Sequence, residues 1–171
     1  GIKRWDLESG KSTTFLGGKG RWAALAASGD GRRVAAVVGR QDGEFVSVID
    51  AEIVLLDVES GVRRALPTHG ARLTHAVALD ANGERLVTGD ASGAARVGGV
   101  TGQEPHLLLG HDGPVTDVAI SPDGRWVASA SGAEIRLWPV PDVSKPPLHT
   151  RPYAALMAKL RALTNLQVVE D

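Results

Sequence analysis

The sequence predicts an all-β protein built from repeated small sheets, and three observations lead to this prediction. Short apolar runs alternate with turn dipeptides, similar runs recur at roughly 40 to 50 residues, and the runs are rich in Ala, Val, Leu and Ile. Apolar residues at successive strand positions suit sheets that are covered on both faces. We therefore expect several short-stranded antiparallel sheets stacked on one another.

Three copies of the repeat are expected, over residues 11–61, 62–102 and 103–140, and residues 1–10 are expected to be the end of a further copy. Each copy carries a turn dipeptide between two apolar runs: Asp30-Gly31, Asn82-Gly83 and Asp123-Gly124. These dipeptides tolerate the positive φ that tight hairpins need, so each predicts a strand, a turn and a strand.

The composition changes after the third copy. Residues 141–152 contain four prolines and predict a linker, because proline sustains neither a helix interior nor a central strand. Residues 153–171 are expected to be a helical extension, with an amphipathic helix from about Tyr153 to Leu163 and Pro152 near its first position. We expect its leucine stripe to dock on the sheets rather than on a membrane, because the helix carries only modest positive charge.

The third copy contains Gly110-His111, the segment Ser121-Pro-Asp-Gly124 and Ile135-Arg-Leu-Trp138, and in these residues the chain resembles the WD-repeat β-propeller family. The resemblance covers residues 1–148 and is strongest from Leu107 to Trp138. It implies a partial β-propeller of about three to four four-stranded blades, followed by the short C-terminal amphipathic helix.

In that family a His, a Ser or Thr, a Trp and an Asp staple each blade through buried polar contacts. His111, Ser129 and Trp138 match three of these positions, and we call them the blade staple. The Asp is missing from the turn at residues 131–134, and Pro139 replaces the Asp that follows the Trp in the family. The earlier copies have Gly18 for the His, Leu56 for the Trp and Gly98 for the Trp, so we expect them to depend on apolar packing.

The number of repeats is small for a closed ring, because propellers commonly have four to eight blades. Three alternatives stay open: the chain is the C-terminal part of a longer protein that completes the ring, two copies share one ring, or the array is an open solenoid. Residues 148–169 also resemble the extension that follows the propeller in large bacterial signalling proteins. That resemblance implies a bacterial source and an attached signalling effector.

Composition and charge exclude several classes of protein. The chain has 19 Lys and Arg against 20 Asp and Glu, a net charge of −1, so a nucleic-acid partner is not expected. It has no cysteine, which excludes disulfides and thiolate chemistry. It has no membrane-length apolar run and no signal-peptide pattern, so we expect a cytoplasmic location without a membrane partner.

The sequence motifs do not favour catalysis. The segment Ser9-Gly-Lys-Ser-Thr13 resembles the end of a phosphate-binding loop, but Trp5 stands where that loop needs glycine, so a hairpin turn is predicted. The five histidines lack the spacing of a zinc motif, and no nucleophile-elbow sequence is present. We expect no enzyme activity, no cofactor and no metal; a propeller hydrolase would need acids or a metal gathered in the central channel.

The predicted function is non-catalytic recognition of a protein or peptide, or the sensing of one for an attached effector. Residues 39–50 lengthen the connection between two strands, and the resemblance puts this connection on the rim that usually receives peptides. Seven charged residues are candidate partner contacts: Lys19, Arg21, Arg40, Asp42, Glu44, Arg72 and Asp112. The plainer interpretation of each is a solvated surface charge. The alternative function is a structural segment that closes a ring or an assembly and recognises nothing itself.

Overall fold

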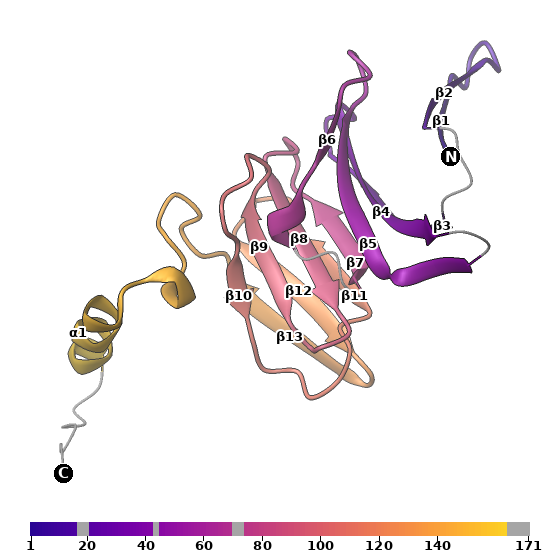
Figure 1. Ribbon diagram of the computed structural model, residues 1–171. Helices are drawn as coiled ribbons and strands as arrows, with labels where there is room; N and C mark the ends of the chain where they lie inside the picture. The colour runs from indigo at the N-terminus through magenta and orange to yellow at the C-terminus, as the bar shows by residue number, and fades with distance from the viewer. Residues whose placement is uncertain (17–20, 43–44, 70–73, 164–171) are drawn as a thin grey trace.

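The computed structural model describes residues 1–16, 21–42, 45–69 and 74–163, and these residues form four antiparallel sheets followed by one helix (Figure 1). The N-terminal half sheet has two strands, the first sheet four, the middle sheet four and the last sheet three. Within the described residues the sheets do not close into a ring (Figure 1).

The strands follow one another along the chain, and each sheet is made of consecutive strands. The half sheet pairs β1 (Ile2–Trp5) with β2 (Ser12–Leu16), and the first sheet contains β3 (Arg21–Ala27), β4 (Arg33–Asp42), β5 (Phe45–Asp57) and β6 (Arg63–Ala65). The middle sheet contains β7 (Thr74–Leu79), β8 (Arg85–Asp90), β9 (Ala95–Gly99) and β10 (His106–Leu108), and the last sheet β11 (Asp117–Ile120), β12 (Trp126–Ser131) and β13 (Glu134–Pro139).

The sheets are offset from the sequence repeats by one strand. β2, β6 and β10 are the first strands of the copies at residues 11–61, 62–102 and 103–140, yet each pairs as the outer strand of the preceding sheet. Each repeat therefore supplies three strands to its own sheet and one strand to the preceding sheet. The backbone hydrogen bonds of that one strand join consecutive sheets.

Tight turns connect the first two strands of each sheet. Gly31, Gly83 and Gly124 have φ values of 70°, 67° and 68°, a region that glycine adopts at little cost. Asp30 Oδ1 accepts the N–H of Arg32 at 3.0 Å, and Asp123 repeats this contact with Arg125 in the last sheet. The dipeptides therefore form these turns through the glycine backbone and the aspartate side chain.

The core lies between the sheets. Ile2 and Phe15 of the half sheet pack on one face of the first sheet, beside Ala36 and Leu56. Buried Val, Leu, Ile and Ala side chains fill the space between the first and middle sheets and again between the middle and last sheets. Burial on both faces explains why the strands are apolar at successive positions.

The lengthened connection at residues 39–50 is largely strand. β4 runs on to Asp42 and β5 begins at Phe45, so that Arg40 pairs with Ser47 and Asp42 with Phe45 after a register shift at Gly39. The sequence offers no turn dipeptide between Gly39 and Asp42-Gly43, and the two strands stay paired up to that point.

The C-terminal part contains a short 3-10 turn at Leu148–Thr150 and the helix α1 (Tyr153–Leu163), which confirms the predicted short helix. The expected docking of this helix on the sheets is wrong. Figure 1 shows α1 standing away from them, and Tyr153 is 76% exposed. The prolines of the linker prevent regular pairing between this segment and the sheets, so the chain leaves the array before the helix begins.

Candidate interaction surfaces

The blade staple residues come together in the last sheet. Ser129, on β12, lies between the other two: its Oγ is 2.7 Å from His111 Nε2 and accepts the indole N–H of Trp138 at 2.8 Å. The His111 and Trp138 rings meet edge to face, with centroids 6.3 Å apart. In the His111 tautomer that carries its hydrogen on Nδ1, Nε2 accepts the Ser129 hydroxyl hydrogen. Each polar atom of the blade staple then has a hydrogen-bond partner.

Glu134 supplies the carboxylate that the sequence appeared to lack. Its Oε2 lies 3.1 Å from His111 Nδ1, and its Oε1 accepts the Arg136 Nε–H at 2.7 Å. The hydrogen bond from Arg136, followed by that from His111, lowers the pKa of Glu134 below its ordinary value. The turn at residues 131–134 places the acid at the first position of β13. Sequence reasoning missed it because it looked for an aspartate within the turn.

The middle sheet has a different polar arrangement, which the sequence did not reveal. The Thr88 hydroxyl donates to the backbone carbonyl of His69 at 3.0 Å. The His69 side chain is fully buried, and among the described residues no group lies in good hydrogen-bond geometry to either ring nitrogen. Gly98 stands at the Trp138 position, where an added Cβ would lie 3.2 Å from His69 Nε2 and 3.0 Å from Pro105. The histidine and the proline therefore occupy space that a larger side chain would need.

A buried ion pair holds the hairpin between β8 and β9. The Asp90 carboxylate accepts hydrogen bonds from Arg96 and from the Ser92 hydroxyl. Burial alone would raise the pKa of Asp90, but the hydrogen bonds from Ser92 and Arg96 outweigh it and hold the pKa below its ordinary value. Asp90 is therefore ionised at neutral pH and serves the hairpin rather than a ligand.

The predicted rim contacts are only partly described by the structure. Lys19, Glu44 and Arg72 lie outside the described residues, and only the backbone of Arg21, Arg40 and Asp42 is described. Arg21 pairs with Gly39, directly before Arg40, so these two cationic positions lie at the same end of neighbouring strands. Asp112 is exposed in the connection between β10 and β11.

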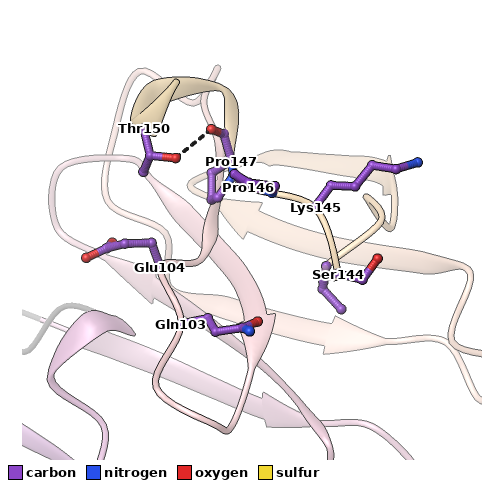
Figure 2. A pocket seen from close by; sticks show the side chains of 8 residues that line it. Gln103, Glu104, Ser144, Lys145, Pro146, Pro147 and Thr150 are labelled. Atoms are coloured by element: carbon purple, nitrogen blue, oxygen red, sulfur yellow. Dashed lines mark hydrogen bonds between the residues drawn. The ribbon is translucent and has the colours of Figure 1, made fainter. Parts of the chain in front are cut away.

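A hollow of about 310 Å³ lies between the β9–β10 connection and the linker, and it was not predicted. Pro146, Pro147 and Val143 form its apolar part. Figure 2 shows the charged ends of Glu104 and Lys145 pointing away from each other, and Lys145 Nζ is held by Asp142 Oδ2 at 2.8 Å. This pairing is the main reason that the pKa of Asp142 falls to about 2. The polar groups do not converge on a ligand position.

The outer face of the last sheet carries exposed apolar side chains. Ile135 and Leu137 on β13 are 73% and 68% exposed, and Trp126 on β12 is 45% exposed. A shallow hollow of about 150 Å³ lies beside them, floored by Ala119, Ala128 and Ala130. Clustered exposed apolar side chains of this kind mark interaction surfaces.

Two further properties of the described residues bear on other functions. They contain no group of three or more His, Asp or Glu side chains arranged to hold a metal ion. None of their helices has the length and apolar character needed to cross a membrane.

Comparison with known proteins agrees with this geometry. The model of the family "WD domain, G-beta repeat" matches residues 102–139. The chain is 27% identical over 143 residues to the WD repeat-containing protein SL1-17 of Schistosoma mansoni, a match that covers 82% of this chain and 44% of that protein. The chain therefore spans less than half the length of this curated relative.

Solved structures share the fold. A chain of the mitotic checkpoint complex superposes with a TM-score of 0.62 and 22% identity, covering 79% of this chain and 39% of that one. The structure of U3-55K gives a TM-score of 0.59 and 19% identity, covering 74% and 38%. These likenesses confirm the predicted all-β, propeller-type fold.

Proposed function

We propose that this chain, a member of the WD-repeat family, is a non-catalytic module that recognises a protein or peptide partner. The observation that carries the proposal is the stack of antiparallel sheets, whose mutual interfaces are buried. A stack of this kind presents side chains in fixed positions, so a few apolar anchors supply affinity and surrounding charges supply specificity.

The recognition module is part of a larger propeller that is attached to a signalling effector in a bacterial, cytoplasmic protein. The apolar end of the array supports the larger propeller, because repeats bury their faces against neighbours. The resemblance of residues 148–169 to the extension of bacterial signalling proteins supports the effector. In this arrangement, the propeller binds the partner and transmits this signal to the attached effector.

The charged rim supplies specificity through Lys19, Arg21, Arg40, Asp42, Glu44, Arg72 and Asp112. We expect a full chain carrying Arg40→Glu and Asp42→Arg to lose partners in a quantitative pull-down while its melting transition stays unchanged. Arg63→Glu on the exposed strand β6 is the matched control and keeps the partners. An unchanged partner set in the double variant would remove the rim from the recognition site.

A structural role is the second candidate, and one observation favours it. Within the described residues the last sheet has three strands, whereas the first and middle sheets have four, so a further sheet or strand would complete it. In this role the chain closes a ring with other blades of the same protein or with a second copy. Loss of assembly in variants of the last sheet, with all other partners retained, would favour it over recognition.

A further inference from the structure

The first turn of the middle sheet holds its side chains differently from the equivalent turns of the first and last sheets. In those two turns an aspartate Oδ1 accepts a serine hydroxyl and a backbone N–H: Asp30 from Ser28 and Arg32, and Asp123 from Ser121 and Arg125. In the middle sheet Asp80 replaces both groups, because its Oδ1 accepts the N–H groups of Glu84 and Arg85. Asn82, which stands at the place of Asp30 and Asp123, is exposed, and its side-chain amide has no hydrogen-bond partner among the described residues.

The free amide of Asn82 is followed by Gly83, and this pair permits a reaction within the main chain. The Gly83 backbone nitrogen attacks Asn82 Cγ, so that an N–Cγ bond forms, the bond from Cγ to the side-chain nitrogen breaks, and ammonia leaves with the proton of the Gly83 amide. Water then opens the cyclic imide at either carbonyl and leaves aspartate or isoaspartate. Glycine favours the attack because it has no Cβ to crowd the nitrogen.

The first sheet covers the attacking nitrogen. Gly83 is buried although Asn82 is exposed, and the covering group is Arg33. An added Cβ on Gly83 would lie 2.9 Å from Arg33 Cβ, and Arg33 Nη1 donates to the Gly83 carbonyl at 2.8 Å. The Gly83 N–H donates to the Asp80 carbonyl at 3.1 Å, the longest of the three equivalent turn bonds. The rate of the reaction therefore depends on how often the Arg33 side chain leaves the turn.

Two hydrogen bonds from the first sheet end on the carbonyls that flank Asn82. The Asp30 N–H donates to the Ala81 carbonyl at 2.9 Å, and Arg33 donates to the Gly83 carbonyl. Isoaspartate adds one carbon to the main chain between these two carbonyls, so both bonds cannot keep their geometry. Ordinary aspartate adds no atom to the main chain, and the equivalent turns already carry it.

We propose that Asn82-Gly83 is a site of spontaneous deamidation in the folded chain, that Arg33 controls its rate, and that the isoaspartate product loosens the junction between the first and middle sheets. The proposal is independent of the recognition role, because it depends only on contacts between two turns.

Peptide mapping by mass spectrometry tests the site. The full chain is kept folded in mildly alkaline buffer, and timed samples are digested. We expect the fragment that holds Asn82 to gain the mass of an amide-to-acid conversion about tenfold faster or more than the fragment that holds Asn165, which precedes Leu166 in the sequence. Equal rates at the two asparagines would overturn the site. So would a rate at Asn82 that rises in proportion to the unfolded fraction in low urea, since the reaction would then belong to the unfolded chain.

The role of Arg33 is tested by the same assay. Arg33→Ala uncovers Gly83, and we expect it to speed the conversion of Asn82 by about threefold or more. Arg32→Ala is the matched control, because it removes the same charge from an exposed neighbouring position, and it leaves the rate unchanged. The same rate in Arg33→Ala and Arg32→Ala would contradict control by Arg33.

The consequence for the junction is tested on the separated isoaspartate form. We expect its Asp30 amide to exchange hydrogen about tenfold faster or more than in the unmodified chain, because the bond to the Ala81 carbonyl is lost. Asn82→Asp keeps the slow exchange, and so does the Gly124 amide in the equivalent turn of the last sheet. Slow exchange of the Asp30 amide in the isoaspartate form, or fast exchange in Asn82→Asp, would show that the added main-chain carbon does not loosen the junction.

Discussion

Ser129 is the residue on which the polar contacts of the last sheet converge. Its single oxygen accepts the Trp138 indole hydrogen and donates to His111, and Glu134 completes the set at the other ring nitrogen. Ser129 and the His111 ring are buried, so loss of any member leaves another group without a partner in a region closed to water.

We expect His111→Ala and Trp138→Ala each to lower the free energy of unfolding by about 2 to 4 kcal/mol, through lost packing and a stranded Ser129 hydroxyl. Urea denaturation followed by circular dichroism measures this. His75→Ala, at an exposed position of β7, and Trp126→Ala are the controls and change little. Losses below roughly 0.5 kcal/mol for both staple variants, the scale of a neutral surface change, would contradict the role of the staple.

His69 predicts a pH dependence of stability. Burial lowers its pKa from 6.5 to about 4, with Arg96 adding to the effect and the backbone of Gly99 opposing it. The unfolded chain therefore binds a proton between pH 6.5 and 4 that the folded chain does not. The free energy of unfolding is therefore highest above pH 6.5, and it falls by about 3 kcal/mol as the pH drops towards 4.

Unfolding free energies measured from pH 7 to 4 test this, with His69→Phe as the variant that loses the dependence and His75→Phe, at an exposed site, as the control that keeps it. Two equal slopes for the wild-type chain and His69→Phe would show that another group sets the pH dependence.

At the scale of elements, the turns that connect the first two strands of the first sheet and of the middle sheet differ in how closely a neighbouring sheet approaches them. An added Cβ on Gly83 would lie 2.9 Å from Arg33 Cβ, whereas one on Gly31 would meet nothing within 4 Å. Arg33 also donates to the Gly83 carbonyl at 2.8 Å, which ties the first sheet to the turn of the middle sheet.

Gly31→Ala should therefore lower the free energy of unfolding by about 1 kcal/mol, because only the positive φ disfavours alanine there. Gly83→Ala should lower it by clearly more, because the added side chain would also push the neighbouring sheet away. Thermal denaturation of the pair separates the two effects. Equal costs would mean that the turn of the middle sheet moves freely relative to the first sheet.

The elements were predictable where the signal was local. Three hairpins were predicted from the turn dipeptides Asp30-Gly31, Asn82-Gly83 and Asp123-Gly124, and the bounds of α1 were predicted from helical spacing together with Pro152. The contribution of each repeat's first strand to the preceding sheet depends on pairing between distant segments, which no local pattern carries. His69 was missed for the same reason, because the groups around it become neighbours only when the strands align.

At the scale of the whole molecule, stacking gives equivalent residues unequal environments. Leu55 and Leu137 occupy the same place in their sheets by register, but Leu55 is covered by the middle sheet and is 7% exposed, while Leu137 is 68% exposed at the end of the array. The difference comes from the neighbouring sheet and not from the local sequence.

We therefore expect Leu55→Ala to lower the free energy of unfolding by about 2 to 5 kcal/mol, since it opens a cavity in a closed interface. Leu137→Ala should change it by no more than about 0.5 kcal/mol, because water already contacts that side chain. Urea denaturation at several protein concentrations measures both values. A large cost for Leu137→Ala that grows with concentration would show that a second copy covers the last sheet, and a large cost independent of concentration would show that another part of the same chain does. Only the small value leaves this face available to a partner.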